Sequence, residues 1–125
     1  MCLQSFGAFD FEDSHFGYFV FEMTVAMAYI ITKAAREGHE NPWKYGGRFM
    51  RGYMSRHKLS ESELAVVVTS VAVRFVVSFV LSMDCQKELI KNNDILYFHS
   101  RSMSPLLKRY YEEGKERIAG IIMNS

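Results

Sequence analysis

The chain has 125 residues, of which 49% are hydrophobic and 23% charged, and its formal net charge is +1. This composition excludes a disordered chain and predicts a single folded domain over residues 1–125. The low net charge gives no overall attraction to nucleic acid or anionic lipid, so any such attraction must be local. Cys2 and Cys85 are too few for a disulfide scaffold or a zinc site. Because residues 1–13 also lack the pattern of a signal peptide, we expect a cytoplasmic protein.

The first half of the chain contains signals for two helices. The first helix is predicted to begin behind residue 13 or 14 and to end near Arg36, because cations occupy its last turn and Gly38 follows. Asn41 and Pro42 then form an N-cap followed by proline at the first helical position. Three glycines, at positions 46, 47 and 52, predict that the second helix is short or broken.

The most apolar stretch of the chain, residues 64–81, is predicted to be a third helix. Ser60 and Glu63 form a capping box directly before it. Its valines would also suit a strand, but a run of this length without a turn residue favours a helix. Because it is apolar on nearly every side, we expect it to be buried all round, in a protein core or in a bilayer.

The last third of the chain predicts shorter helices. One begins near Asp84 and breaks at the asparagines 92 and 93, a turn or two follows Asp94, and a final helix starts behind Ser104 and Pro105. The predicted fold is therefore all-α, a compact single-domain bundle of four to six helices around a central apolar helix at about 61–83.

Each of the two most apolar predicted helices carries one central charge, Glu22 in the first and Arg74 in the third. Charges at these positions are costly in a bilayer, so we favour a soluble core and expect no membrane association. Antiparallel packing would place Glu22 and Arg74 at similar depth, which predicts a buried charge pair. Alternatives are that Arg74 extends to the surface, pairs with Asp84 or Asp94, or binds an anionic ligand.

Positive charge is concentrated in residues 41–58, which contain five Lys or Arg and no acid, interleaved with aromatic residues. Cations that neutralise phosphates and aromatics that stack on bases are typical of nucleic-acid binding. Aromatics packed into the bundle, with a solvated basic face left outside, explain the same pattern equally well, and an acidic protein partner is a third interpretation. The predicted partner or nucleic-acid site consists of Lys44, Arg48, Arg51, Arg56, His57 and Lys58.

No catalytic constellation, metal site or cofactor motif is evident, so we predict none. The sequence favours a small non-enzymatic binding or regulatory protein that acts through protein–protein contacts and forms a homo-oligomer, most simply a dimer. The alternative is a nucleic-acid-binding protein that uses the basic segment. A remote alternative is a small helical ribonuclease, because Arg51 and His57 lie close together in the sequence.

Overall fold

The computed structural model describes residues 17–84 and 94–125, with side chains described for residues 17–81 and 103–125. Five α-helices occupy this described part: α1 Phe19–Arg36, α2 Trp43–Met54, α3 Glu61–Asp84, α4 Asp94–Glu113 and α5 Lys115–Met123. The prediction of an all-α fold is confirmed.

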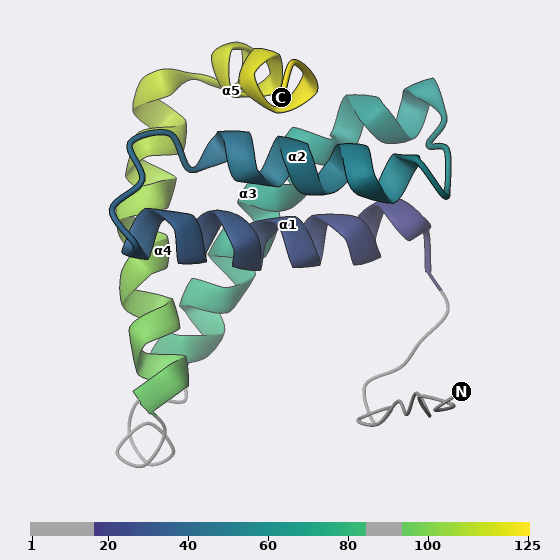
Figure 1. Cartoon of the computed structure of the whole chain (residues 1–125). Helices are drawn as coiled ribbons and strands as arrows, with labels where there is room; N and C mark the ends of the chain where they lie inside the picture. The colour runs from purple at the N-terminus through teal and green to yellow at the C-terminus, as the bar shows by residue number, and fades with distance from the viewer. Residues whose placement is uncertain (1–16, 85–93) are drawn as a thin grey trace, which may run out of the picture.

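Helices α1 and α2 form an antiparallel hairpin that lies across α3, as Figure 1 shows. Helix α4 runs along one end of this hairpin and packs against α3 and α1, while α5 folds back over α2. All five helices therefore meet around one core. Its buried hydrophobic side chains include Met23, Met27, Ile31, Trp43, Met50, Val67, Val71, Phe75, Met103, Leu106, Ile118 and Ile122.

Helix α1 ends where the sequence predicts, at Arg36, and Gly38 follows in the left-handed conformation with φ of 81°. Helix α2 is continuous over its 12 residues, so the predicted break is absent. Its glycines allow close packing instead. A Cβ atom at Gly46 would lie 2.7 Å from Cδ1 of Ile31, and one at Gly47 would lie closer still to the carbonyl oxygen of Ile122. These two glycines let α1 and α5 approach the α2 backbone.

Helix α3 begins with the predicted capping box. The Ser60 backbone N–H donates to Oε2 of Glu63 at 2.9 Å, and the Glu63 N–H donates to Oγ of Ser60 at 3.3 Å. The prediction that this helix is buried all round is wrong. The fully buried side of α3 is narrow. The span Glu61–Leu81 is long and apolar enough, by length and composition, to cross a membrane, and only 22% of its most apolar window is buried inside the structure.

The C-terminal helices divide at a different point from the predicted one. Pro105 lies inside a continuous α4 instead of starting a new helix, although it removes one helical N–H donor. The break occurs at Gly114, whose φ of 84° ends α4 and starts α5. The helix predicted to begin near Asp84 falls mostly on residues 85–93, outside the described part, and α3 itself extends to Asp84.

Candidate functional site

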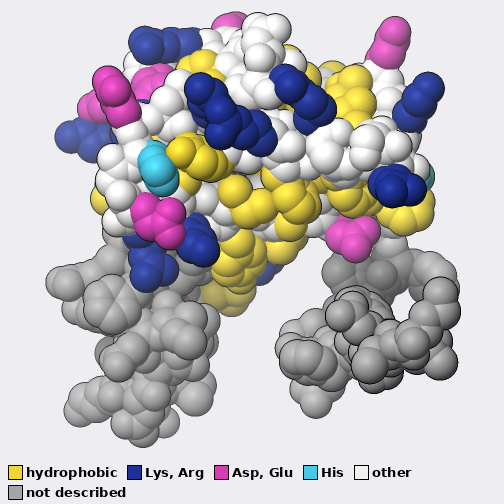
Figure 2. All heavy atoms as spheres, viewed as in Figure 1, with side chains coloured by type: hydrophobic (Ala, Val, Ile, Leu, Met, Phe, Trp, Pro, Cys, Tyr) yellow, Lys and Arg dark blue, Asp and Glu magenta, His cyan; other side chains and the backbone are white. Residues whose placement is uncertain are grey.

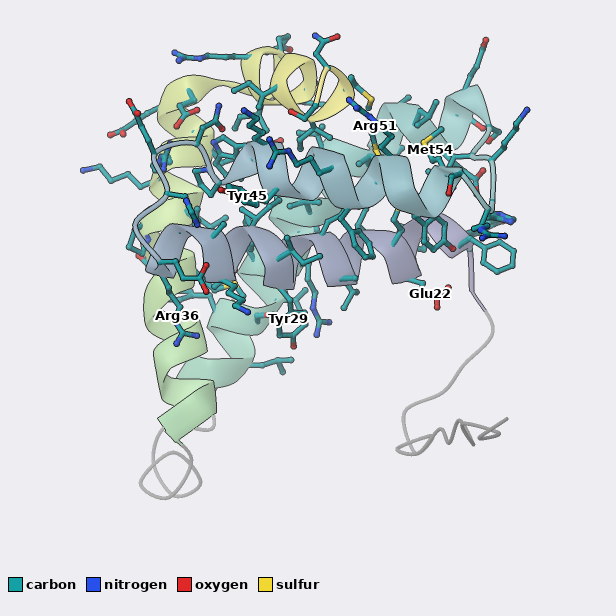
Figure 3. All side chains as sticks on the ribbon, viewed as in Figure 1. Glu22, Tyr29, Arg36, Tyr45, Arg51 and Met54 are labelled. Carbon is teal, nitrogen blue, oxygen red and sulfur yellow. The ribbon has the colours of Figure 1, made fainter. Side chains whose placement is uncertain are left out.

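The predicted basic segment forms the outer face of α2 and the turn after it. Lys44, Arg48, Arg51, Arg56 and Lys58 are all exposed, and Figure 2 shows Lys and Arg side chains along this face. Figure 3 shows Arg51 on the upper side of α2. Their positions therefore match the solvated basic face that the sequence left open, and partner binding by these residues stays a prediction.

The aromatic residues of the same segment point inward. Trp43 is 1% exposed, and Phe49 and Tyr53 are half-buried against the core. Tyr45 is the partial exception, because the guanidinium of Arg48 lies 5.5 Å from its ring centroid. An indole that is buried in this way is not available to stack on a nucleotide base.

His57, the remaining predicted binding residue, belongs to a separate cluster where α1 begins and α2 ends. Its ring centroid lies 4.2 Å from that of Phe19 and 6.0 Å from that of Tyr53. Because His57 packs against these two rings, it is not part of the exposed basic face.

Tyr53 of the same cluster also interacts with Glu22. Burial raises the pKa of the Tyr53 hydroxyl, and the negative charge of Glu22 and a hydrogen bond to Glu22 raise this pKa further.

The predicted buried pair between Glu22 and Arg74 is not formed. Glu22 is exposed and faces Tyr53, whereas the Arg74 guanidinium lies 5.9 Å from the ring centroid of Tyr29, about two turns further along α1. No ion pair within the described residues joins the two charges. The prediction failed because matched depth along two helices does not specify which faces meet. The Nε atom of Arg74 is buried and has no hydrogen-bond acceptor within the described part.

A polar network that the sequence analysis missed joins α2 to the end of α4. The indole Nε1 of Trp43 donates to Oε2 of Glu113 at 3.1 Å. Arg109 donates from Nε to the other carboxylate oxygen of Glu113 at 2.9 Å, and from Nη2 to the Glu40 backbone oxygen at 3.1 Å. The spacing of Arg109 and Glu113 is a visible helix-pair signal, but their contact with Trp43 depends on the tertiary fold.

The loop between α1 and α2 carries the other polar group of note. The Tyr45 hydroxyl lies 3.1 Å from Nδ1 of His39, and Nε2 of His39 lies 3.6 Å from Oε2 of Glu37. Among the described residues, no three His, Cys, Asp or Glu side chains are placed to hold a metal ion. The polar groups of this loop therefore lie at helix termini and at the junction of α1 with α2.

The most unusual surface of the molecule is hydrophobic. It consists of exposed side chains on two packed helices, α1 and α3, and we call it the α1–α3 apolar face. Figure 2 shows hydrophobic side chains gathered below α2, continuing downward to the lower end of the described surface. The residues of this face are Phe21, Tyr29, Val66, Val73, Val76, Val77, Val80 and Leu81.

Comparison with known proteins gives one consistent result. The chain is 30% identical over 112 residues to a hydroxylysine kinase of Danio rerio. This alignment covers 90% of the chain and 30% of the kinase. It is 25% identical over 115 residues to the hydroxylysine kinases of Xenopus laevis and Bos taurus, which covers 92% of this chain and 29% of each kinase. No family model and no solved structure matches the chain.

The chain thus spans about 30% of the length of the curated relatives it matches. Because these relatives are enzymes, the prediction of a non-enzymatic protein that acts through protein–protein contacts is wrong, and its nucleic-acid and ribonuclease alternatives are not supported. The prediction rested on the lack of a catalytic motif, whereas the similarity to these kinases is spread over 112 aligned residues and is not visible as a motif.

Proposed function

We propose that this chain is a helical unit of a kinase-like enzyme that phosphorylates the hydroxyl group of hydroxylysine or of a closely related amino alcohol. The observation that carries the proposal is the alignment of 90% of the chain with a hydroxylysine kinase at 30% identity. An alignment of this length extends over several helices and their connections, so it is not the chance likeness of one apolar helix.

The structure supports treating these residues as one unit. The network of Trp43, Arg109 and Glu113 joins the start of α2 to the end of α4, and the glycines of α2 seat α1 and α5. Segments from both ends of the described chain are therefore held in one arrangement. A unit of this kind suits a reaction whose catalysis depends on positioning and electrostatics.

In the proposed reaction the acceptor hydroxyl oxygen attacks the terminal phosphorus of a nucleoside triphosphate. A new oxygen–phosphorus bond forms, the bond to the bridging oxygen breaks, the nucleoside diphosphate leaves, and the hydroxyl proton passes to a base. Neither the glycine-rich loop nor the H-R-D catalytic loop of protein kinases occurs in the sequence. We therefore assign this chain a role in supporting the enzyme and not in binding the phosphates.

A segment graft tests the proposal. In the Danio rerio hydroxylysine kinase, the residues aligned with this chain are replaced by the chain itself. The purified chimera is given magnesium and ATP or GTP, with hydroxylysine as the acceptor and lysine as the control. We expect phosphorylated hydroxylysine and nucleoside diphosphate in equal amounts, and no product from lysine, because lysine lacks the attacking oxygen.

The matched control is the same kinase carrying an unrelated helical segment of equal length, which should give no product. The proposal is overturned if the chimera folds, as judged by a single cooperative melting transition, and yet produces no more phosphorylated hydroxylysine than this control.

A further inference from the structure

The hydrophobic side chains on the outside of α3 are arranged as a stripe. Val66, Val73, Val77 and Val80 recur at helical spacing on one side of the helix. Val73 is 54% exposed, and Leu81, the residue after Val80, is 56% exposed. Isolated exposed valines are ordinary, but a stripe of this length on a helix that also contacts the core is not. The helix therefore has two apolar sides, and the described helices cover only one of them.

Helix α1 extends this surface. Phe21 and Tyr29 are 51% and 46% exposed, and α1 packs directly on α3. The guanidinium of Arg74 lies 5.9 Å from the Tyr29 ring centroid, which places an α3 residue against the exposed side of α1. Figure 3 shows Tyr29 pointing downward from α1. The two helices thus meet at Tyr29 and Arg74, and each contributes exposed apolar side chains to the α1–α3 apolar face.

Arg74 indicates what kind of surface covers this face. The side chain of Arg74 is half-buried, and its guanidinium lies 5.9 Å from the ring centroid of the exposed Tyr29, so a carboxylate or carbonyl oxygen on the covering surface would offset the positive charge of this guanidinium. The acyl chains of a bilayer supply no acceptor, and a central arginine is costly there. A polypeptide surface with apolar side chains and one acceptor fits better.

We infer that the α1–α3 apolar face is an internal interface, covered by the part of the kinase fold that the relatives have and this chain does not span. This inference rests on the proposed function. It is supported by the coverage of the alignments, since about 70% of each relative lies outside the aligned part, and that polypeptide must contact the helical unit somewhere. The α1–α3 apolar face is the part of the described surface best suited to such a contact.

The experiment introduces lysines on the interface and, as a control, on another exposed apolar position. Val73→Lys and Val77→Lys are combined in one variant, and Met123→Lys on α5, where Met123 is 41% exposed, is the matched control. Each is made in the isolated 125-residue chain and in the chimera. Thermal melting is measured for both, and binding is measured between the isolated chain and the Danio rerio kinase polypeptide that lacks the aligned residues.

In the isolated chain we expect neither variant to change the melting temperature by more than a degree or two, because all three positions are at the surface. In the chimera, the Val73→Lys/Val77→Lys pair should lower the melting temperature by several degrees, whereas Met123→Lys should not. Binding of the remaining kinase polypeptide should weaken about a hundredfold with the lysine pair, since unpaired ammonium groups would be buried. Hydrogen exchange should slow on α1 and α3 in the complex.

The inference is wrong if the lysine pair and Met123→Lys behave alike in the chimera, or if the remaining polypeptide neither binds the chain nor slows its exchange. It is also wrong if the isolated chain forms a dimer or binds lipid vesicles through this face and the kinase polypeptide does not compete. Product formation from hydroxylysine is measured separately. A chimera that is stable and sensitive to the lysine pair but inactive would therefore refute the proposed function and keep the interface.

Discussion

Trp43 and Glu113, which lie 70 positions apart in the sequence, are joined by a hydrogen bond from the indole Nε1 to the carboxylate. The same carboxylate forms an ion pair of 2.8 Å with Arg109, whose guanidinium also lies 6.0 Å from the Trp43 ring centroid. A buried indole N–H needs an acceptor, and Glu113, whose side chain is only 18% exposed, provides it. This contact fixes the start of α2 against the end of α4.

Replacement of Glu113 should therefore be costly. Glu113→Ala leaves the Trp43 N–H without its acceptor and Arg109 without its partner, so we expect the free energy of unfolding to fall by about 1–3 kcal/mol. The neighbouring Glu112 pairs with Lys108 at the surface over 3.8 Å, and Glu112→Ala should change stability by about 0.5 kcal/mol or less. Urea unfolding of the two variants measures the difference. Equal losses would show that the network contributes nothing beyond an exposed ion pair.

Two glycines of α2 should respond to alanine in opposite directions. A Cβ atom at Gly47 would collide with the Ile122 backbone, so Gly47→Ala should destabilise the protein by about 1–3 kcal/mol. A Cβ at Gly52 meets nothing within 4 Å, and Gly52→Ala should stabilise it by about 0.5–1 kcal/mol through the better helix propensity of alanine. Thermal or urea unfolding tests the pair. A neutral or stabilising effect of Gly47→Ala would contradict the close packing of α5 on α2.

Acid should weaken the start of α3. A hydrogen bond from the Ser60 backbone N–H lowers the pKa of the Glu63 carboxyl below its ordinary value of 4.5, and a hydrogen bond from the Ser60 hydroxyl lowers this pKa further. The unfolded chain therefore binds the proton at higher pH than the folded one, so this contribution is present above pH 4.5 and is lost as the pH falls through the lowered pKa. Unfolding curves of the parent and of Glu63→Gln should differ at neutral pH and converge in acid. A difference that stays constant with pH would refute the effect.

A double-mutant cycle tests where the charge of Glu22 acts. Because Glu22 faces Tyr53 and Arg74 lies against Tyr29, Glu22→Gln and Arg74→Met should be additive to within about 0.5 kcal/mol. The combination of Glu22→Gln with Tyr53→Phe should show a larger coupling energy, because the two residues interact. If the first pair couples more strongly than the second, Glu22 and Arg74 are partners after all.

Local signals predicted the end of α1 and the start of α3 correctly, but they did not predict the start of α1 at Phe19 or the place of Pro105 inside α4. The capping box at Ser60 and the left-handed Gly38 were both recognisable, because a helix terminus is specified by residues within a few positions of it. Gly46 and Gly47 were misjudged as helix breakers. Their penalty in an isolated helix is real, but the close approach of neighbouring helices outweighs it, and that approach is a property of the whole fold.

The candidate site could be predicted from the sequence only in part. The cations of residues 41–58 were expected to be exposed if their aromatics packed inward, and Trp43 does so. The apolar run of α3 was taken as evidence for a helix buried on every side, in a protein core or in a bilayer. A helix with one buried and one exposed apolar side has the same composition, so composition does not distinguish the two cases. The similarity to hydroxylysine kinases was found by comparison with longer proteins and not from a motif.

The close approach of α5 to Gly47 also bears on the order in which parts of the molecule unfold. Helix α5 has nine residues, which are too few for a helix to persist alone in water. Its helical state therefore depends on its packing against α2. The Trp43–Glu113 contact belongs to α4, because Glu113 comes before the break at Gly114. Backbone amides of α5 should therefore exchange with solvent through a local opening, well before those of α1 and α2 become accessible in global unfolding.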